Sequence, residues 1–202
     1  MLSIAITGAG TAGAQTETTT PEPTAEAAAQ PLRVGFRRLH VRAGGKAVVR
    51  GRATPGQRVR LKVRRDGGWT TLRAATVRSD GRFVVRAHPH TPMSVSARVT
   101  AGGRSRRLGR LNVYRYAQAS WYGPGLYGNH LACGGTLTPG TLGVANKSLP
   151  CGAKVTIRHG AHVVRVKVVD RGPYAGDREY DLTARTARKL HFSGTGAVLT
   201  TR

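Results

Sequence analysis

Four carboxylic acids in the last third of the sequence are candidates for proton-transfer chemistry: Asp170, Asp177, Glu179 and Asp181. A carboxyl group can donate a proton to a leaving oxygen or take one from a hydroxyl group. Asp170 directly follows the valine-rich run 163–169 and precedes an Arg-Gly-Pro sequence. A β-strand that ends at this point would bring the carboxyl group to the rim of the fold.

Other catalytic and binding chemistries lack a candidate in the sequence. It contains no Gly-x-Ser-x-Gly nucleophile turn and no phosphate-binding glycine loop of the P-loop or dinucleotide type. The histidine pairs His88/His90 and His159/His162 have no further ligands at the spacing of a zinc site. We therefore expect neither a metal nor another cofactor.

The sequence holds only two cysteines, Cys133 and Cys151, which are 18 positions apart. Each of them is next to glycine in a turn-like context. A single disulfide, formed in an oxidising compartment, is the simplest interpretation. Two buried free thiols are the alternative.

The first 14 residues predict an export signal peptide. An apolar run of small residues begins at Leu2, and the sequence Ala12-Gly13-Ala14 has the small-x-small form that signal peptidase cleaves. The usual positive charges are missing, which a start codon assigned too far downstream would explain. A flexible Ala/Gly tail is the alternative.

Residues 15–31 are rich in Thr, Pro and Ala, and they predict a disordered linker. No run of about twenty apolar residues occurs, so we expect no membrane-spanning helix. The N-terminal pattern and the cysteines together predict a secreted protein.

Basic charge is concentrated in residues 32–116, which carry 22 of the 33 Lys and Arg residues and only two acids; the whole chain has a formal charge of +24. Such a segment predicts an acidic polymer as partner, whether nucleic acid, an anionic lipid surface or an anionic wall polymer. Export argues against nucleic acid. Codon bias in a G+C-rich genome is the alternative explanation of the many arginines.

The same segment, residues 32–116, consists of short β-rich runs separated by Gly, Pro and Asp turns. About seven strands at this spacing predict an antiparallel β-sandwich with Arg and Lys on its outer faces. The segment resembles the immunoglobulin-like modules of exported bacterial proteins. The expected core residues are Val59, Leu61, Val63, Trp69, Leu72 and Phe83. A ligand platform is the alternative role of Trp69.

A second unit is expected over residues 117–202, because the charge density falls beyond the sequence 114–118. Composition predicts strands at 154–157, 163–169 and 197–201. One helix is expected over Ala184–Leu190, with Thr183 as its N-cap.

Nearly all of residues 117–202 resemble the rare lipoprotein A (RlpA) family. The segments that carry the resemblance are 119–125, 136–138, 144–152, 169–174 and 181–183. It implies an all-β fold in which a six-stranded double-psi β-barrel with one short helix follows the sandwich. It also implies a peptidoglycan lytic transglycosylase, which cleaves the bond between N-acetylmuramic acid and N-acetylglucosamine and leaves a 1,6-anhydro product.

The resemblance implies Asp170 as the catalytic acid and base, with Asp181 as a second carboxylate. One carboxyl group can first protonate the glycosidic oxygen and then take the proton of the muramic C6 hydroxyl, if an apolar or anionic neighbourhood keeps it protonated. Repulsion between the two acids in one groove would raise one pKa, and Arg171 would oppose this. Alternatively, each acid caps a turn or the helix.

Five side chains are predicted to bind the glycan, with Trp121 and Tyr122 as stacking platforms or, alternatively, barrel core. The full predicted set is Trp121, Tyr122, Asn146, Arg171 and Tyr174. We expect a monomer that acts on peptidoglycan glycan strands.

Three positions depart from the pattern of active RlpA members. Gly135, Thr138 and Asn146 occupy the positions where the family pattern places Glu, Asp and His. The alternative to an active enzyme is therefore a non-catalytic glycan-binding barrel.

Overall fold

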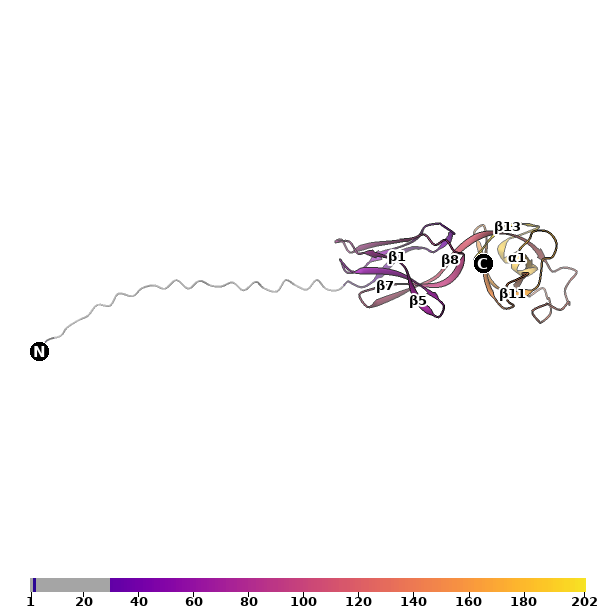
Figure 1. The fold of residues 1–202 in the computed structure, drawn as a ribbon, viewed down its shortest axis with the longest axis horizontal. Coiled ribbons are helices and arrows are strands. Elements are labelled where there is room, and N and C mark those ends of the chain that lie inside the picture. Colours follow the sequence, from indigo (N-terminus) through magenta and orange to yellow (C-terminus); the bar gives the residue numbers. More distant parts are fainter. Residues whose placement is uncertain (1, 3–29) are drawn as a thin grey trace.

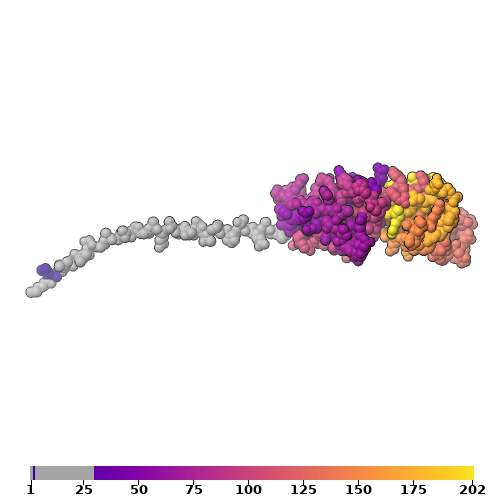
Figure 2. All heavy atoms as spheres, in the orientation of Figure 1, coloured from indigo at the N-terminus to yellow at the C-terminus, as the bar shows by residue number. Residues whose placement is uncertain are grey.

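The computed structural model describes residue 2 and residues 30–202, which form an all-β molecule with one short helix. The predicted signal peptide, residues 1–14, and nearly all of the predicted linker, residues 15–31, lie outside the described residues. Among the helices described, none is long and apolar enough to cross a membrane. The chain forms two adjacent lobes, the first indigo to magenta and the second orange to yellow (Figures 1 and 2).

The first lobe contains two sheets. One sheet has the strand order β1-β3-β6; its strands are Arg33–Arg38, Ala47–Arg52 and Arg82–Ala87. The other runs β5-β4-β7-β8, and β2 pairs with β8 in parallel. The strands of this second sheet, in chain order from β2, are His40–Arg42, Arg58–Arg65, Gly68–Thr76, Met93–Ala101 and Arg104–Tyr122.

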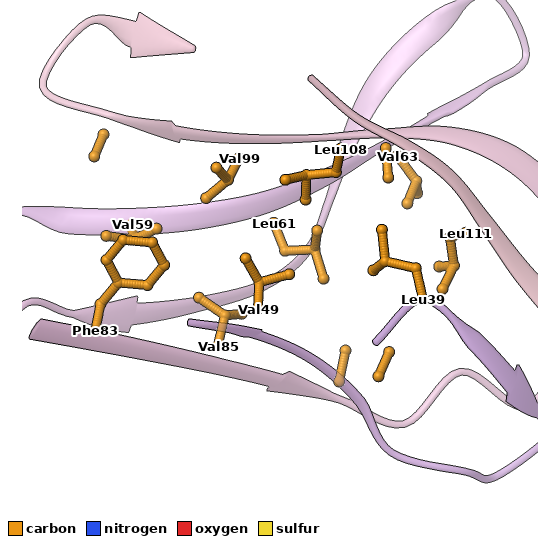
Figure 3. Close-up of a cluster of buried hydrophobic side chains, with 14 of the residues drawn as sticks. Leu39, Val49, Val59, Leu61, Val63, Phe83, Val85, Val99, Leu108 and Leu111 are labelled. Atoms are coloured by element: carbon orange, nitrogen blue, oxygen red, sulfur yellow. The ribbon is translucent and has the colours of Figure 1, made fainter. Parts of the chain in front are cut away.

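Alternation along the strands builds the core of the first lobe. In β4, Val59, Leu61 and Val63 are buried, whereas Arg60 and Arg64 are exposed. The predicted outward placement of the basic side chains is thus found in this strand. Figure 3 shows the core side chains filling the space between the ribbons. Each fully buried Val, Leu or Phe side chain contributes about 1.5–3 kcal/mol to stability.

The prediction that Trp69 belongs to this core is wrong. Its indole is only half-buried and lies on the outer face of the sheet, where the guanidinium carbon of Arg98 is 4.0 Å from the ring centroid. Leu72 is partly buried and packs against the core, and Phe83 is fully buried. Trp69 directly pairs with the exposed Arg64, which places it on the charged face of the sheet.

Strand β8, 19 residues long, belongs to both lobes. It pairs with β7 of the first lobe as far as Val113 and with β13 of the second lobe from Arg115 to Ala119. The change of partner falls in the sequence 114–118, where the charge density drops. The strand runs through this point without interruption (Figure 1).

Six strands close the second lobe into a barrel. Around the ring the order is β8-β13-β10-β11-β9-β12, and β12 returns to β8 through a parallel pairing. The five further strands, β9 to β13, are Gly143–Ala145, Lys154–His159, His162–Asp170, Tyr180–Thr183 and Gly196–Thr200. All three strands predicted from composition in this lobe overlap observed strands. Because every strand has two neighbours, the barrel leaves no unpaired sheet edge.

The helix α1 spans Ala184–Leu190, as the sequence predicts. Thr183 precedes it, but its hydroxyl group makes no cap hydrogen bond. The Thr183 Oγ1 atom instead donates to the Thr141 carbonyl at 2.8 Å and accepts from the Gly143 N–H at 3.2 Å. Thr183 therefore ties the start of the helix to β9.

The two lobes also touch through side chains around Ser94. Its Oγ atom accepts hydrogen bonds from Thr156 Oγ1 at 3.1 Å and Arg165 Nη1 at 2.8 Å, both in the barrel. From the first lobe, Arg110 Nε donates to the same oxygen at 2.9 Å. These bonds brace the lobes beside the shared strand.

We predict that Gly143→Ala destabilises the protein. A Cβ atom at this position would lie 2.4 Å from a methyl carbon of Val169, so β9 and β11 would have to shift. We expect the free energy of unfolding to fall by about 1–3 kcal/mol. The matched control is Gly35→Ala in β1, where nothing lies within 4 Å of the new Cβ. Equal denaturation midpoints for the two variants would contradict the prediction.

Candidate functional site

Four neighbouring barrel strands bring the two predicted catalytic acids together. Asp181 of β12 pairs with Ser120 of β8 on one side and with Ala145 of β9 on the other. Asp170 of β11 also pairs with Ala145. The backbones of the two acids are thus two strands apart, roughly 10 Å, with only a small side chain between them.

Asp170 accepts three hydrogen bonds. Its Oδ1 atom accepts from the backbone N–H groups of Ala132 and Arg171 at 2.8 Å and 2.9 Å, and its Oδ2 atom accepts from the Tyr122 hydroxyl at 3.2 Å. The side chain remains partly exposed. Hydrogen-bond donors thus fix the position of both oxygens of this carboxyl group.

Asp181 lies in a different environment. Its Oδ1 atom accepts one hydrogen bond, from Ser120 Oγ at 2.8 Å, and the residue is partly exposed. Partial burial raises the pKa of its carboxyl group, and the charge of Asp170 acts in the same direction. The Ser120 hydrogen bond and the Arg178 charge oppose this rise without cancelling it. Asp181 therefore retains its proton to higher pH than an ordinary aspartic acid does.

Tyr122 of β8 binds Asp170 of β11 through its hydroxyl group. Its side chain is half-buried, and burial, followed by the charge and hydrogen bond of Asp170, raises the pKa of its phenol group. The hydroxyl therefore stays protonated and remains a donor to Asp170. This role differs from that of a freely exposed stacking platform.

The other two predicted aromatic contacts are open to solvent. The residue exposure is 39% for Trp121 and 78% for Tyr174. Trp121 precedes Tyr122 in β8, and Tyr174 follows the turn after Asp170. Both rings are thus available at the end of the barrel that carries the acids.

Asn146 and Arg171 bind mainly to the protein itself. The Asn146 side chain is buried; its Nδ2 atom donates to the Glu179 carbonyl, and its Oδ1 atom accepts from the N–H groups of Ser148 and Leu149. The Arg171 guanidinium donates to the carbonyls of Asn146 and Leu149. Both side chains hold the loop before β10, and their contact with glycan stays a prediction.

The predicted disulfide between Cys133 and Cys151 is present. The Cys133 N–H donates to the Val169 carbonyl at 3.2 Å, so the bridged loop lies against the end of β11. This contact positions the neighbouring Ala132 N–H, which binds Asp170. The disulfide therefore supports the local environment of that carboxylate.

The sequence did not point to three contributors to the site. Ala132 acts through its backbone, which leaves no side-chain signal. Ser120 and Arg178 act through their positions beside Asp181, and only the strand pairing reveals these. The alternation of side chains along β8 could have predicted which face of the strand Ser120 occupies. It could not have predicted that Asp181 lies opposite Ser120.

The departing positions Gly135 and Thr138 lie in the loop before β9. Gly135 has a φ of +81°, a conformation that favours glycine. Thr138 Oγ1 accepts from the Gly140 N–H at 3.2 Å and lies 3.1 Å from Thr141 Oγ1. Local turn geometry accounts for both residues.

Comparison with known proteins shows that the barrel is similar in sequence to transglycosylases. Residues 116–200 match a family model described as "Lytic transglycolase". This match covers the closed six-stranded ring, which is consistent with a double-psi β-barrel. The second lobe is thus RlpA-like in sequence and consistent with that family in fold.

Three curated relatives illustrate the similarity. A probable endolytic peptidoglycan transglycosylase RlpA of Synechocystis is 44% identical over 85 residues, covering 40% of this chain and 26% of the relative. The endolytic peptidoglycan transglycosylase RlpA of Campylobacter jejuni is 38% identical over 80 residues (39% and 29%). That of Pseudomonas aeruginosa is 32% identical over 114 residues (55% and 31%). The chain spans between a quarter and a third of the length of these relatives.

One solved structure, the BSP domain of a biofilm associated protein, aligns with 74% of this chain and 28% of its own. The sequence identity is 16% and the TM-score is 0.26, so this likeness supports no conclusion.

We predict that Asp181→Asn stabilises the protein at neutral pH. The folded state raises the pKa of Asp181, so ionisation of this acid is more costly in the folded than in the unfolded chain. The stability of the native protein relative to the variant should therefore fall as pH rises above about 4, the ordinary pKa of Asp. The melting temperatures of both proteins at pH 4 and pH 7.5 test this. The difference in melting temperature between variant and native protein should be more favourable to the variant at pH 7.5 than at pH 4. The opposite order would contradict the prediction.

We predict that removal of the disulfide weakens the barrel. The double variant Cys133→Ser/Cys151→Ser releases a loop of 18 residues, and the chain-entropy relation gives a loss of about 3 kcal/mol in unfolding free energy. Urea denaturation of the variant and of the oxidised native protein measures this difference. Unchanged stability would show that the bridge does not constrain the unfolded chain.

Proposed function

We propose that the protein is an exported peptidoglycan lytic transglycosylase of a bacterial cell envelope, and that the pair Asp181 and Asp170 carries the reaction. The different environments of these two acids are the observation that supports it most. One acid has a raised pKa and a single hydrogen-bond donor, and the other accepts three hydrogen bonds. The similarity of residues 116–200 to named RlpA transglycosylases supports the same reaction.

In this mechanism, the protonated Asp181 donates its proton to the oxygen between N-acetylmuramic acid and N-acetylglucosamine. The bond from that oxygen to the muramic C1 atom breaks, and the Asp170 carboxylate stabilises the positive charge that develops at C1. The C6 hydroxyl oxygen then bonds to C1, and its proton passes to Asp181. The 1,6-anhydro ring closes without consuming water, and Asp181 regains its initial protonation state.

The division of roles differs from the expectation that Asp170 alone acts as acid and base. Asp181 has one hydrogen-bond donor and a raised pKa, which suits a proton donor. Asp170 has Tyr122 as a fixed donor, which suits a carboxylate that stabilises charge. Trp121 and Tyr174 would contact the sugar rings, because both are exposed beside this end of the barrel.

We further propose that the first lobe is an immunoglobulin-like module that holds the enzyme on an anionic wall polymer. Two sheets around one core, with basic side chains on the outer faces, support this role. The excess of 20 positive charges in residues 32–116 supports an acidic partner.

A non-catalytic glycan-binding barrel is the second candidate function. It is favoured by Asn146, whose amide is fully used in binding backbone groups, and by Gly135, which offers no side chain. Under this alternative, Asp170 and Asp181 would serve to order the loop and strand ends.

Digestion of sacculi stripped of stem peptides and anionic polymers distinguishes the two candidates. We expect the native protein to release fragments with 1,6-anhydromuramic ends, and Asp181→Asn and Asp170→Asn to lower the rate by about 100-fold or more. The control is Asp66→Asn, which removes an exposed carboxylate of the first lobe. Mass spectrometry identifies the ends. Sedimentation of the native protein with sacculi without any release would establish the binding role instead.

A further inference from the structure

The outer face of the sheet β5-β4-β7-β8 carries adjacent positive charges. Lys62 of β4 pairs with Arg98 of β7, which in turn pairs with Arg107 of β8. Like charges directly opposite each other on neighbouring strands are destabilising. Neither of the two ion pairs found within residues 30–202 includes any of these three side chains.

Arg98 is held in this row by an aromatic ring. Its guanidinium carbon lies 4.0 Å from the centroid of the Trp69 ring, a close cation–π contact. Within the described part of the chain, the Arg98 Nε atom is the one buried side-chain polar atom without a hydrogen-bond partner. A buried donor without a hydrogen-bond partner costs free energy, so the contact with Trp69 holds Arg98 in place at a cost.

A hollow of about 380 Å³ adjoins this row. Arg64 and Trp69 line it on one side, and Arg107 and Arg110 of β8 line it on another. Ser96 of β7 and Gly109 of β8 also line it. The pairing of β7 with β8 shifts between Ala97 and Arg98, where β8 carries the extra residue Leu108 next to Gly109, whose φ is +89°. This β-bulge locally alters the strand and so shapes the hollow.

No acidic side chain among those that the structure describes pairs with Arg110, which also lines the hollow. Its Nε atom donates to Ser94 Oγ at 2.9 Å, and a second nitrogen donates to the Ser94 carbonyl. Burial and the neighbouring charge of Arg165 both lower the pKa of Arg110. Its polar partners are neutral, so the hollow retains its positive field.

The opposite sheet of this lobe is also basic but has a different character. There Arg82 pairs with Asp80 at 3.9 Å, and Arg50 lies over the exposed ring of Phe36. Arg50, Arg82 and Arg86 are all exposed, so water can solvate them. The unsatisfied Arg98 Nε atom therefore distinguishes the Trp69 face from the opposite sheet.

We propose that the hollow beside Trp69 binds a phosphate group of a phosphodiester-linked polyol polymer through Arg64 and Arg107, and that Arg98, which lies against the Trp69 ring outside the lining of the hollow, positions that ring. The guanidinium groups approach from β4 and from β8, which flank β7. A tetrahedral phosphate offers acceptors in more than one plane, and arginine binds such groups in a bidentate manner. The volume suits a single repeating unit of such a polymer.

The geometry favours this ligand over a nucleic acid. Single-stranded nucleic acids are held by bases that stack on free aromatic faces. The guanidinium of Arg98 already covers one face of Trp69. The inference rests on the proposed attachment of the first lobe to an anionic polymer and specifies its site.

Equilibrium binding of the full chain to a glycerol-phosphate polymer tests the proposal. We expect Trp69→Leu, which leaves the net charge unchanged, and Arg107→Gln to weaken binding by about tenfold each, the effect of one lost charged hydrogen bond. The matched control, Arg86→Gln on the opposite sheet, removes the same charge and should weaken binding by no more than about twofold. Melting temperatures verify that each variant is folded. If Trp69→Leu is not folded, Arg98→Gln provides a second test of the site.

Each outcome decides one of the two proposals. If the native protein binds the polymer and all variants bind alike, diffuse charge suffices, and the Trp69 site is refuted while attachment survives. If the native protein does not bind, both fail, whereas release of anhydro fragments from stripped sacculi is unaffected. Tighter binding to polygalacturonate would assign the site to carboxylates, and tighter binding to single-stranded DNA would assign it to nucleic acid; either result overturns the proposal.

Discussion

The parallel pairing of β12 with β8 is the constraint on which the barrel and its acids depend. It closes the ring of six strands and places Asp181 beside Ser120. Because β9 then lies between β12 and β11, the same closure fixes the separation of Asp181 from Asp170 across the single small residue Ala145. A barrel open at this point would separate Asp181 from Ser120, the hydrogen-bond donor that β8 supplies to it.

Hydrogen bonding differentiates these acids more than distance does. Asp170 lies at the end of a strand, where the loop containing Ala132 folds against it and donates an N–H group. Asp181 lies within a strand whose own N–H groups serve the ladder, so a single hydroxyl is its donor. Two residues of the same type thereby lie in different hydrogen-bonding environments, and the pKa of Asp181 is raised by burial.

Local patterns in the sequence predicted the elements, whereas contacts between distant segments could not be predicted. The helix over Ala184–Leu190 and the Cys133–Cys151 bridge follow from composition and spacing. Trp69 was assigned to the core because large aromatic residues usually are buried, but strand register placed it with the charged residues. The role of Ala132 is carried by a backbone amide, and the raised pKa of Asp181 arises from burial, which neither residue type reveals.

The uninterrupted β8 has a mechanical consequence. Arg107 and Ser120 lie in this one strand, with thirteen residue steps between them, a contour of roughly 40 Å. A load applied between the two lobes would pull along β8 and shear its ladders with β7 and β13, in which many hydrogen bonds must break together. Under the proposed attachment, the distance between the acids and the surface of the first lobe that binds the polymer would thus stay constant while the wall stretches.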